Sequence, residues 1–178
     1  MAAVPRADFL PAEVQHLAAE DVALPLGSGQ TNSQPRTVAA MLRLLAVEPG
    51  HRVLDVGAGS GWSTALLGHL VGEAGQVLGV ELVPELTQQA VTNLAQRSME
   101  WAQVRQADPD VFGAPQEAPF DRVLVSAEAE ELPDSLVAQL SDGGIMVVPV
   151  RGEMLKVVKR GGDVEVSRHG PYRFVPLL

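Results

Sequence analysis

The sequence predicts an α/β fold that is doubly wound around a mainly parallel sheet, with helices on both faces and an antiparallel C-terminal end. Two observations predict it. Short apolar runs alternate with segments of helical spacing along most of the chain, which is typical of a parallel sheet covered on both faces. One apolar run, 53–56, leads directly into glycines at 57, 59 and 61, which allow a strand to turn tightly into a helix.

The length of 178 residues suits a single domain over 1–178. Residues 1–25 are weakly patterned and punctuated by prolines, so we expect an N-terminal arm on that domain rather than a separate domain. A short helix is expected within the arm, over 12–19.

A polar loop is expected over 26–35, followed by a helix. Ser33 is a candidate for the N-cap of this helix, because its hydroxyl oxygen can accept a hydrogen bond from a free backbone N–H of the first turn. Pro35 fits the first turn. The sequence Glu-Pro-Gly at 48–50 ends the helix. Its apolar face consists of residues at helical spacing: Val38, Met41, Leu42 and Leu45.

The remaining elements follow from the same reasoning. Asp-Gly-Gly at 142–144 stops a helix, and Gly-Gly-Asp at 161–163 predicts a turn. The predicted strands are 53–56, 77–80, 104–106, 120–125, 145–150, 155–159 and 164–166. The predicted helices include 64–67, begin again at Pro84, and cover 133–140, with a loop over 109–119.

Composition excludes several classes of function. The net charge of −9 argues against a nucleic-acid partner, which needs clustered Lys and Arg, and against an anionic membrane surface. No apolar run reaches membrane-spanning length, and the first eleven residues lack the apolar core of a signal peptide. We therefore expect a soluble cytoplasmic protein.

Cysteine is absent, which excludes disulfides, thiolate zinc sites and cysteine nucleophiles. The histidines are scattered and lack the spacing of a zinc site, so no metal site is predicted. They are His16, His51, His69 and His169.

The glycine motif predicts the start of a Rossmann-like mononucleotide-binding unit. Residues 53–61 read Val-Leu-Asp-Val-Gly-Ala-Gly-Ser-Gly, and the next strand ends at Glu81, whose carboxylate can accept hydrogen bonds from a ribose diol. Trp62 stands where a dinucleotide motif has its third small residue, which disfavours a dinucleotide oxidoreductase. The observed spacing resembles the first motif of class I S-adenosylmethionine-dependent methyltransferases.

Over nearly its whole length the chain resembles protein-L-isoaspartate O-methyltransferases. The most specific segment is 27–35, Gly-Ser-Gly-Gln-Thr-Asn-Ser-Gln-Pro, which is similar to the substrate loop G-x-G-Q-T-I-S-x-P of that family. The other segments that carry the resemblance are 81–86, close to E-x-x-P-E-L, then 117–125 and 140–150. The last is Arg-Phe-Val-Pro-Leu at 173–177, which looks like the closing strand of the family.

The resemblance implies a repair activity. The family uses S-adenosyl-L-methionine to methylate the free α-carboxylate of isoaspartyl residues in damaged proteins, and the ester then cyclises to a succinimide that can reopen as normal aspartate. The implied partners are isoaspartyl-containing proteins or peptides. A carboxylate is already nucleophilic at neutral pH, so such a site needs to align it in a water-poor cleft and needs no general base.

The resemblance also implies the roles of individual residues. Ser33 matches the family's active-site serine and is the candidate catalytic residue, while Gln30, Thr31 and Ser126 are expected to bind substrate with it. The implied cofactor-binding residues are Gly57, Gly59 and Gly61 beside the methionine portion, Asp55 near the turn or the amino group, Glu81 at the ribose, and Asp108 near the adenine.

Three departures from the family pattern bear on the substrate. The arm over 1–25 is shorter than usual, and Asn32 replaces an apolar residue of the substrate loop. Residues 126–130 read Ser-Ala-Glu-Ala-Glu where the family has T-A-A-A-P. A glutamate, Glu128 or Glu130, that points into the cleft at ~4–6 Å would repel a carboxylate by roughly 3–4 kcal/mol. Alternating glutamates in a loop favour a position at the rim, in water.

Two alternative functions stay open at this level. One is a methyltransferase of the same fold with another acceptor, such as a small molecule or tRNA, although the charge of −9 disfavours tRNA. The other is a cofactor-binding protein that has lost isoaspartyl activity. The sequence leaves the oligomeric state open, with a monomer favoured.

Overall fold

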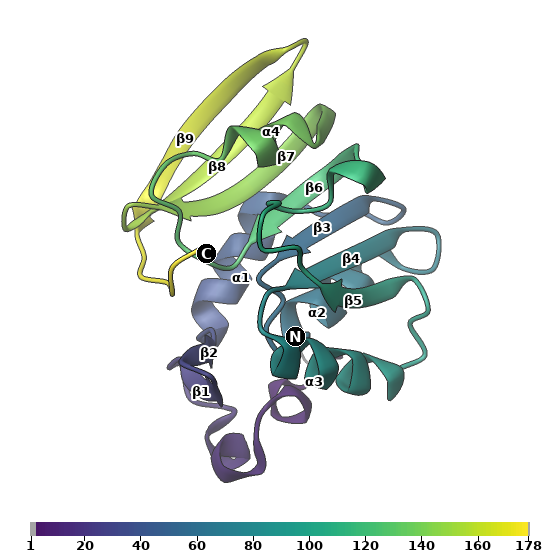
Figure 1. Ribbon diagram of the computed structural model, residues 1–178, viewed down its shortest axis with the longest axis vertical. Coiled ribbons are helices and arrows are strands. Elements are labelled where there is room, and N and C mark those ends of the chain that lie inside the picture. Colours follow the sequence, from purple (N-terminus) through teal and green to yellow (C-terminus); the bar gives the residue numbers. More distant parts are fainter. Residues whose placement is uncertain (1–2, 178) are drawn as a thin grey trace.

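A seven-stranded sheet forms the centre of the computed structural model, which describes residues 3–177 (Figure 1). The strand order is β5-β4-β3-β6-β7-β8-β9. Neighbouring strands from β5 to β7 are parallel, β8 is antiparallel to β7, and β9 is antiparallel to β8. The predicted fold class is confirmed. The strands are β3 (Arg52–Val56), β4 (Gln76–Glu81), β5 (Ala102–Gln106), β6 (Phe120–Val125), β7 (Leu140–Val150), β8 (Glu153–Arg160) and β9 (Asp163–Pro171).

Helices cover both faces unequally. One face carries α1 (Pro35–Leu45), α2 (Trp62–Val71) and α3 (Pro84–Ala95), and the other carries the short α4 (Asp134–Ala138). Both α1 and α3 begin with proline at the first turn, where its missing N–H costs nothing. Three 3₁₀ segments complete the helical elements of the described residues: η1 (Arg6–Phe9), η2 (Ala12–Leu17) and η3 (Pro115–Glu117). Within residues 3–177, no helix has both the length and the apolar character needed to cross a membrane.

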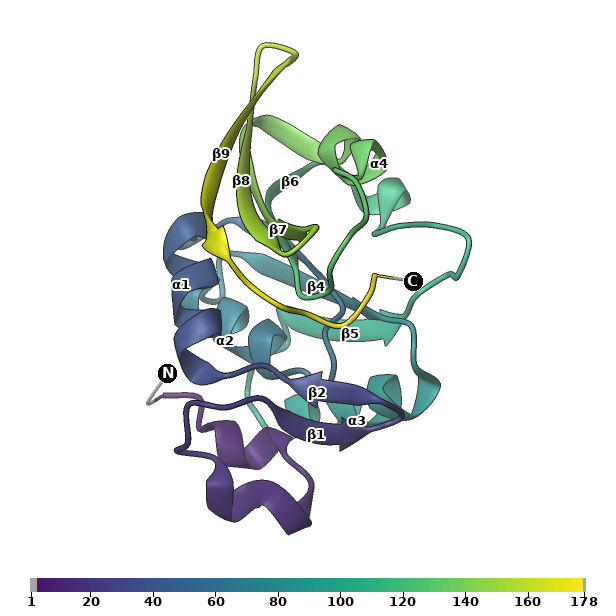
Figure 2. The same ribbon diagram turned by 90° about the vertical axis from the view of Figure 1, so that its left-hand side faces the viewer.

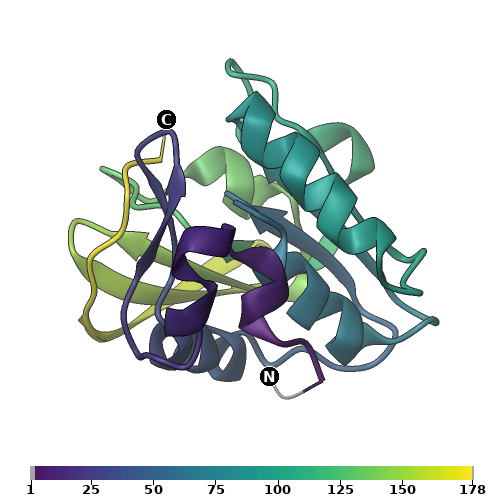
Figure 3. The ribbon, with the colours of Figure 1, turned by 90° about the horizontal axis from the view of Figure 1, so that it is seen from below.

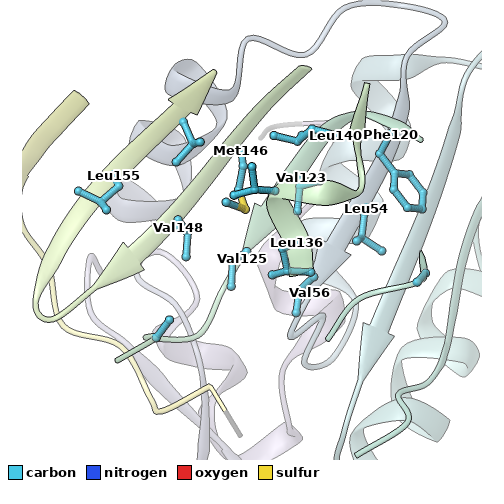
Figure 4. Packing of buried hydrophobic residues seen from close by; sticks show 14 of the residues in the cluster. Leu54, Val56, Phe120, Val123, Val125, Leu136, Leu140, Met146, Val148 and Leu155 are labelled. Carbon is cyan, nitrogen blue, oxygen red and sulfur yellow. The ribbon is translucent and has the colours of Figure 1, made fainter. Parts of the chain in front are cut away.

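The core follows from the alternation of side chains along the strands. Leu54 and Val56 of β3 join the cluster beneath α4, whereas Val53 faces α1 and α2. Figure 4 shows the first cluster, in which residues of β3, β6 and β7 interdigitate with Leu136 of α4. The inner strands β3, β4 and β6 are covered on both faces and carry mostly apolar residues, whereas the edge strand β5 alternates buried and exposed residues.

The topology switches direction between β3 and β6. From β3 the chain proceeds outward to β4 and β5 and then returns to place β6 on the opposite side of β3. The two strands end together, and the Ser126 N–H donates to the Val56 carbonyl oxygen at 2.8 Å. A crevice at the carboxyl ends of such strands is the usual ligand site of this architecture.

The expected loop over 26–35 is wrong, because most of it lies in a β-hairpin. Its strands are β1 (Leu24–Gly27) and β2 (Gln30–Asn32), which pair antiparallel. The turn between them has positive φ at Gly27, Ser28 and Gly29. We refer to residues 24–33 as the substrate hairpin.

The predicted N-cap role of Ser33 is also wrong. The N-cap of α1 is Gln34, and its side chain makes no capping hydrogen bond. Gln34 is extended, with ψ 142°, because the residue before a proline is biased away from the helical region.

The C-terminal half differs from prediction at its element boundaries. Helix α4 ends at Ala138, and β7 begins at Leu140 instead of 145. The predicted stop at 142–144 lies inside β7, where the pairing with β6 slips between Phe120 and Arg122. The segment 173–177 is not a strand; it makes one isolated bridge, from Pro176 to Glu128.

The N-terminal arm lies between the substrate hairpin and α3 (Figure 3). Instead of one helix over 12–19 it contains the two short 3₁₀ segments η1 and η2. Val4 and Phe9 are fully buried against α2 and α3. The arm therefore connects the hairpin to the helical face of the sheet.

Candidate functional site

A cavity lies at the topological switch, beyond the carboxyl ends of β3, β4 and β6. About 740 Å³ of its space is free of protein atoms, part of it open to solvent. The structure brings seven of the predicted site residues to its lining: Gln30, Thr31, Gly57, Gly59, Glu81, Asp108 and Ser126. Ser33, Asp55 and Gly61 do not line it.

The glycine turn forms the floor of this cavity. Gly57 and Gly59 have φ of 77° and 56°, which other residues adopt only with strain, and both expose backbone to the cavity. Gly61 has a different task. A Cβ at this position would lie 3.2 Å from the Cβ of Ala90, so the glycine allows α2 to begin close against α3.

Glu81 joins the tip of β4 to the glycine turn. Its Oε2 accepts the Gly59 N–H at 2.7 Å, and its Oε1 accepts the Val83 N–H at 2.9 Å. The side chain is buried yet borders the cavity. Each carboxylate oxygen has a further lone pair, so the fixed carboxylate can also accept hydroxyl groups from a ligand.

Asp55 lies behind the turn and is fully buried. Its Oδ2 accepts the hydroxyls of Ser63 and Thr64, each at 2.7 Å, which anchors the first turn of α2. Oδ1 has no partner among the described residues. Burial raises the pKa of Asp55 to about 6, the two hydroxyls act in the opposite direction, and the Glu81 charge adds to the rise.

The far wall of the cavity is formed by the loop after β5. Asp108 is exposed there, and its Oδ1 accepts the Asp110 N–H at 3.0 Å. Phe112 and Gly113 continue the wall. Sequence reasoning missed these wall residues, because they lie in a stretch that shows only proline and glycine punctuation.

Gln139 fixes this wall from behind. The side chain is buried, its Oε1 accepts the Ala114 N–H at 2.8 Å, and its Nε2 donates to the carbonyl oxygens of Phe112 and Ser135 at 2.8 and 2.9 Å. A lone glutamine after a helix carries no local signal of this role, so the sequence did not single it out.

The last residues cover the cavity. Val175, Pro176 and Leu177 line it, and Figure 2 shows this segment, in yellow, crossing the carboxyl edge of the sheet above β2. Two backbone hydrogen bonds hold it in place: Glu128 N–H to Val175 O and Leu177 N–H to Glu128 O, both at 2.7 Å.

Ser33 lies at an adjoining opening. It lines two further hollows next to the main cavity, and Thr31 and Ser126 line these hollows as well as the cavity itself. Thr31 and Ser126 therefore mark the junction between the cavity and the outside. Tyr172, Arg173 and Phe174 form the opposite wall of the larger hollow.

The two glutamates of the 126–130 segment lie away from these hollows. Glu130 is exposed, and Glu128 is half-buried with Oε2 accepting the Phe174 N–H at 3.4 Å. Neither lines the cavities described above. Glu130 agrees with the expected position in water, whereas Glu128 is half-buried and supports the C-terminal segment. Among residues 3–177, no group of three or more side chains has the geometry of a metal site.

The whole chain, residues 1–178, matches the model of the family described as Protein-L-isoaspartate(D-aspartate) O-methyltransferase (PCMT). It is 44% identical over 184 residues to a protein-L-isoaspartate O-methyltransferase of Methanopyrus kandleri, covering 100% of this chain and 81% of that protein.

Solved structures show the same fold. One protein-L-isoaspartate O-methyltransferase superposes with a TM-score of 0.89 at 26% identity, over 98% of this chain and 58% of its own length. A candidate member from Plasmodium falciparum, solved with S-adenosyl-L-homocysteine, superposes with a TM-score of 0.86 at 24% identity. The match covers 99% of this chain and 87% of that protein's chain. The chain spans somewhat more than half of the first structure and most of the second. By the family match over its full length and its 44% identical relative, the chain belongs to the protein-L-isoaspartate O-methyltransferase family, a family of S-adenosylmethionine-dependent enzymes.

Proposed function

We propose that this protein methylates the α-carboxylate of isoaspartyl residues in proteins and peptides, with S-adenosyl-L-methionine as the methyl donor. The observation that carries the proposal is the position of Thr31 and Ser126. They border both the cavity at the topological switch and the outer hollow that contains Ser33. A bound donor and an incoming peptide would meet at these two residues.

The residues of the cavity fit the cofactor. The glycine turn leaves backbone open to a ligand, and Glu81 has lone pairs free for the ribose hydroxyls. Asp108 stands at the end where the adenine amino group would lie. When bound, S-adenosylmethionine supplies a methyl group on a positively charged sulfur that a carboxylate oxygen can displace.

Asp55 and Gly61 act from behind the cavity. Asp55 anchors the α2 start through Ser63 and Thr64, and its buried Oδ1, which has no partner among the described residues, can accept a hydrogen bond from a bridging water. Gly61 permits the close α2–α3 contact that holds the turn. Their roles in binding are therefore to shape the turn.

The substrate carboxylate would be held by Ser33 with Gln30, Thr31 and Ser126. Hydroxyl and amide groups donate hydrogen bonds that orient a carboxylate without removing its charge. Positioning is the main requirement, because an ionised carboxylate needs no general base. The C-terminal segment, which lines the cavity, would limit the access of water to the reacting groups.

The proposal includes the organisation and location of this chain. One domain, 1–178, carries the activity as a monomer in the cytoplasm. Its substrates are damaged proteins and include neither nucleic acids nor membranes, which agrees with the net charge of −9.

The test is transfer of labelled methyl from S-adenosylmethionine to an isoaspartyl peptide. The same peptide with normal aspartate is the substrate control, and Glu81→Ala is the enzyme control. Selective labelling of the isoaspartyl peptide by the wild-type chain alone supports the proposal. Intact cofactor binding without labelling would overturn it in favour of another acceptor or a binding protein.

A further inference from the structure

Arg6 is a buried cation that joins two segments far apart in the sequence. Only 5% of the residue is exposed, although it lies in the N-terminal arm. Its Nε donates to the side-chain oxygen of Asn32 at 2.7 Å. One terminal nitrogen donates to Glu20 O at 3.1 Å, and the other is shared by three carbonyl oxygens, those of Val22 at 2.8 Å, Asn32 at 3.0 Å and Ser33 at 3.1 Å.

These partners divide into two groups with Arg6 between them. Glu20 and Val22 belong to the end of the arm, whereas Asn32 and Ser33 belong to the substrate hairpin. The guanidinium also lies over the Trp62 ring at the start of α2, 5.5 Å from its centroid. Arg6 therefore ties the hairpin to the arm and to the helix that follows the glycine turn.

The chemistry of this contact favours positioning over simple stabilisation. Every oxygen that accepts from Arg6 is neutral, and burial lowers the pKa of its guanidinium, so the charge is held without a directly bonded carboxylate. A buried charge is a costly way to gain stability, since apolar residues of similar volume are often as good or better. The planar guanidinium of arginine instead provides several directed hydrogen bonds from one rigid group.

Three of these bonds fall on Asn32 and Ser33, the residues that determine where Ser33 lies. The Ser33 carbonyl is itself an acceptor, and Asn32 accepts through both its backbone and its side chain. Asn32 is the residue that departs from the apolar pattern of the family loop, and it is buried in contact with Arg6. We propose that Arg6 and Asn32 form a positioning pair that sets the substrate hairpin for the isoaspartyl carboxylate, an inference that rests on the function proposed above.

The test compares three single variants. Arg6→Lys keeps the charge but loses the planar guanidinium with its Nε donor. Asn32→Leu removes the side-chain acceptor and keeps the branched shape and the number of heavy atoms. Arg97→Gln is the matched control: Arg97 binds the same arm through Asp8 at 2.6 Å and stacks on Phe9 at 4.8 Å, but it makes no described hydrogen bond to the hairpin.

We expect Arg6→Lys and Asn32→Leu to raise the KM for the isoaspartyl peptide about tenfold, as the loss of a hydrogen bond to a charged group predicts. Affinity for S-adenosyl-L-homocysteine should change less than about twofold, and Arg97→Gln should leave the peptide KM unchanged. In the double variant Arg6→Lys/Asn32→Leu, the rise in peptide KM should be smaller than the product of the two single rises, since both changes break the same contact.

Amide hydrogen exchange provides a readout that does not depend on activity. Exchange at 30–34 should be faster in Arg6→Lys and Asn32→Leu than in Arg97→Gln. Equal exchange in all three, or an equal rise of peptide KM in Arg97→Gln, overturns the positioning pair. If the wild-type chain does not methylate the peptide, the proposed function fails, while exchange at 30–34 still decides whether Arg6 orders the hairpin. If Arg6→Lys does not fold, Asn32→Leu alone carries the same comparison.

Discussion

The Glu81 carboxylate accepts the Gly59 backbone N–H at 2.7 Å, which links the tip of β4 to the glycine turn after β3. The two parts of the motif are separated by a helix in the sequence but act as one unit in the cavity. The same carboxylate holds the Val83 N–H at the entry to α3. Removal of Glu81 would therefore affect the ligand contact and the shape of the turn together.

Glu81→Ala should weaken binding of S-adenosyl-L-homocysteine by about 1.5–3 kcal/mol, or roughly 10- to 150-fold, because hydrogen bonds to a charged group are lost. Calorimetric titration measures this directly. Glu85→Ala is the control, since Glu85 is exposed in the first turn of α3. Affinity within twofold of wild type would rule out a contact between Glu81 and the cofactor.

Ser33→Ala should lower methyl transfer to an isoaspartyl peptide by about tenfold or more, because one donor to the substrate carboxylate is lost. Cofactor affinity should stay nearly constant, since Ser33 does not line the main cavity. Steady-state kinetics together with titration of S-adenosyl-L-homocysteine separate the two effects. Ser98→Ala, at an exposed position beyond α3, serves as control. An equal loss of cofactor binding would contradict the assigned role.

Asp55 predicts a pH dependence of folding stability. Its pKa is raised by burial from 3.8 to about 6, so folding favours the neutral form. The contribution of Asp55 to the free energy of unfolding is fully present below pH 3.8. It is lost as the pH rises through about 6, and the total loss is about 3 kcal/mol.

Asp55→Asn stays neutral, so the free energy of unfolding of the variant should lack this component. Between pH 4.5 and 7.5, wild type should lose about 2 kcal/mol relative to Asp55→Asn. Urea denaturation at the two pH values gives the difference. If the free energies of unfolding of the two proteins change with pH in the same way, Asp55 has an ordinary pKa in the folded chain.

Gln139→Met should destabilise the chain by about 1–3 kcal/mol, because the buried Ala114 N–H and Phe112 carbonyl lose their partner. The wall of the cavity should loosen with it, so affinity for S-adenosyl-L-homocysteine should fall severalfold. Urea denaturation and calorimetry measure the two effects. Gln103→Met, on the exposed side of β5, is the control. Loss of stability with unchanged affinity would mean that the 112–114 wall does not contact the ligand.

The order of strands and helices could be predicted from the sequence because it depends on local patterns. The apolar run of β3, the glycines after it and Glu81 at the end of β4 each carry their signal within a few residues. Once the strands are parallel, their carboxyl ends meet at one edge, so the site had to lie there. Gly57, Gly59 and Glu81 follow from this reasoning, whereas Gln30, Thr31, Asp108 and Ser126 were implied by the family resemblance.

The tertiary structure decided how that site is closed and supported. Gln139 holds the 112–114 wall, Glu128 holds the C-terminal segment, and Arg6 holds the substrate hairpin, each across more than twenty residues of sequence. These contacts are made by single polar side chains that have no periodic pattern. Their roles depend on which distant backbone groups come within hydrogen-bond distance in the folded chain. The local sequence contains no information on which groups these are.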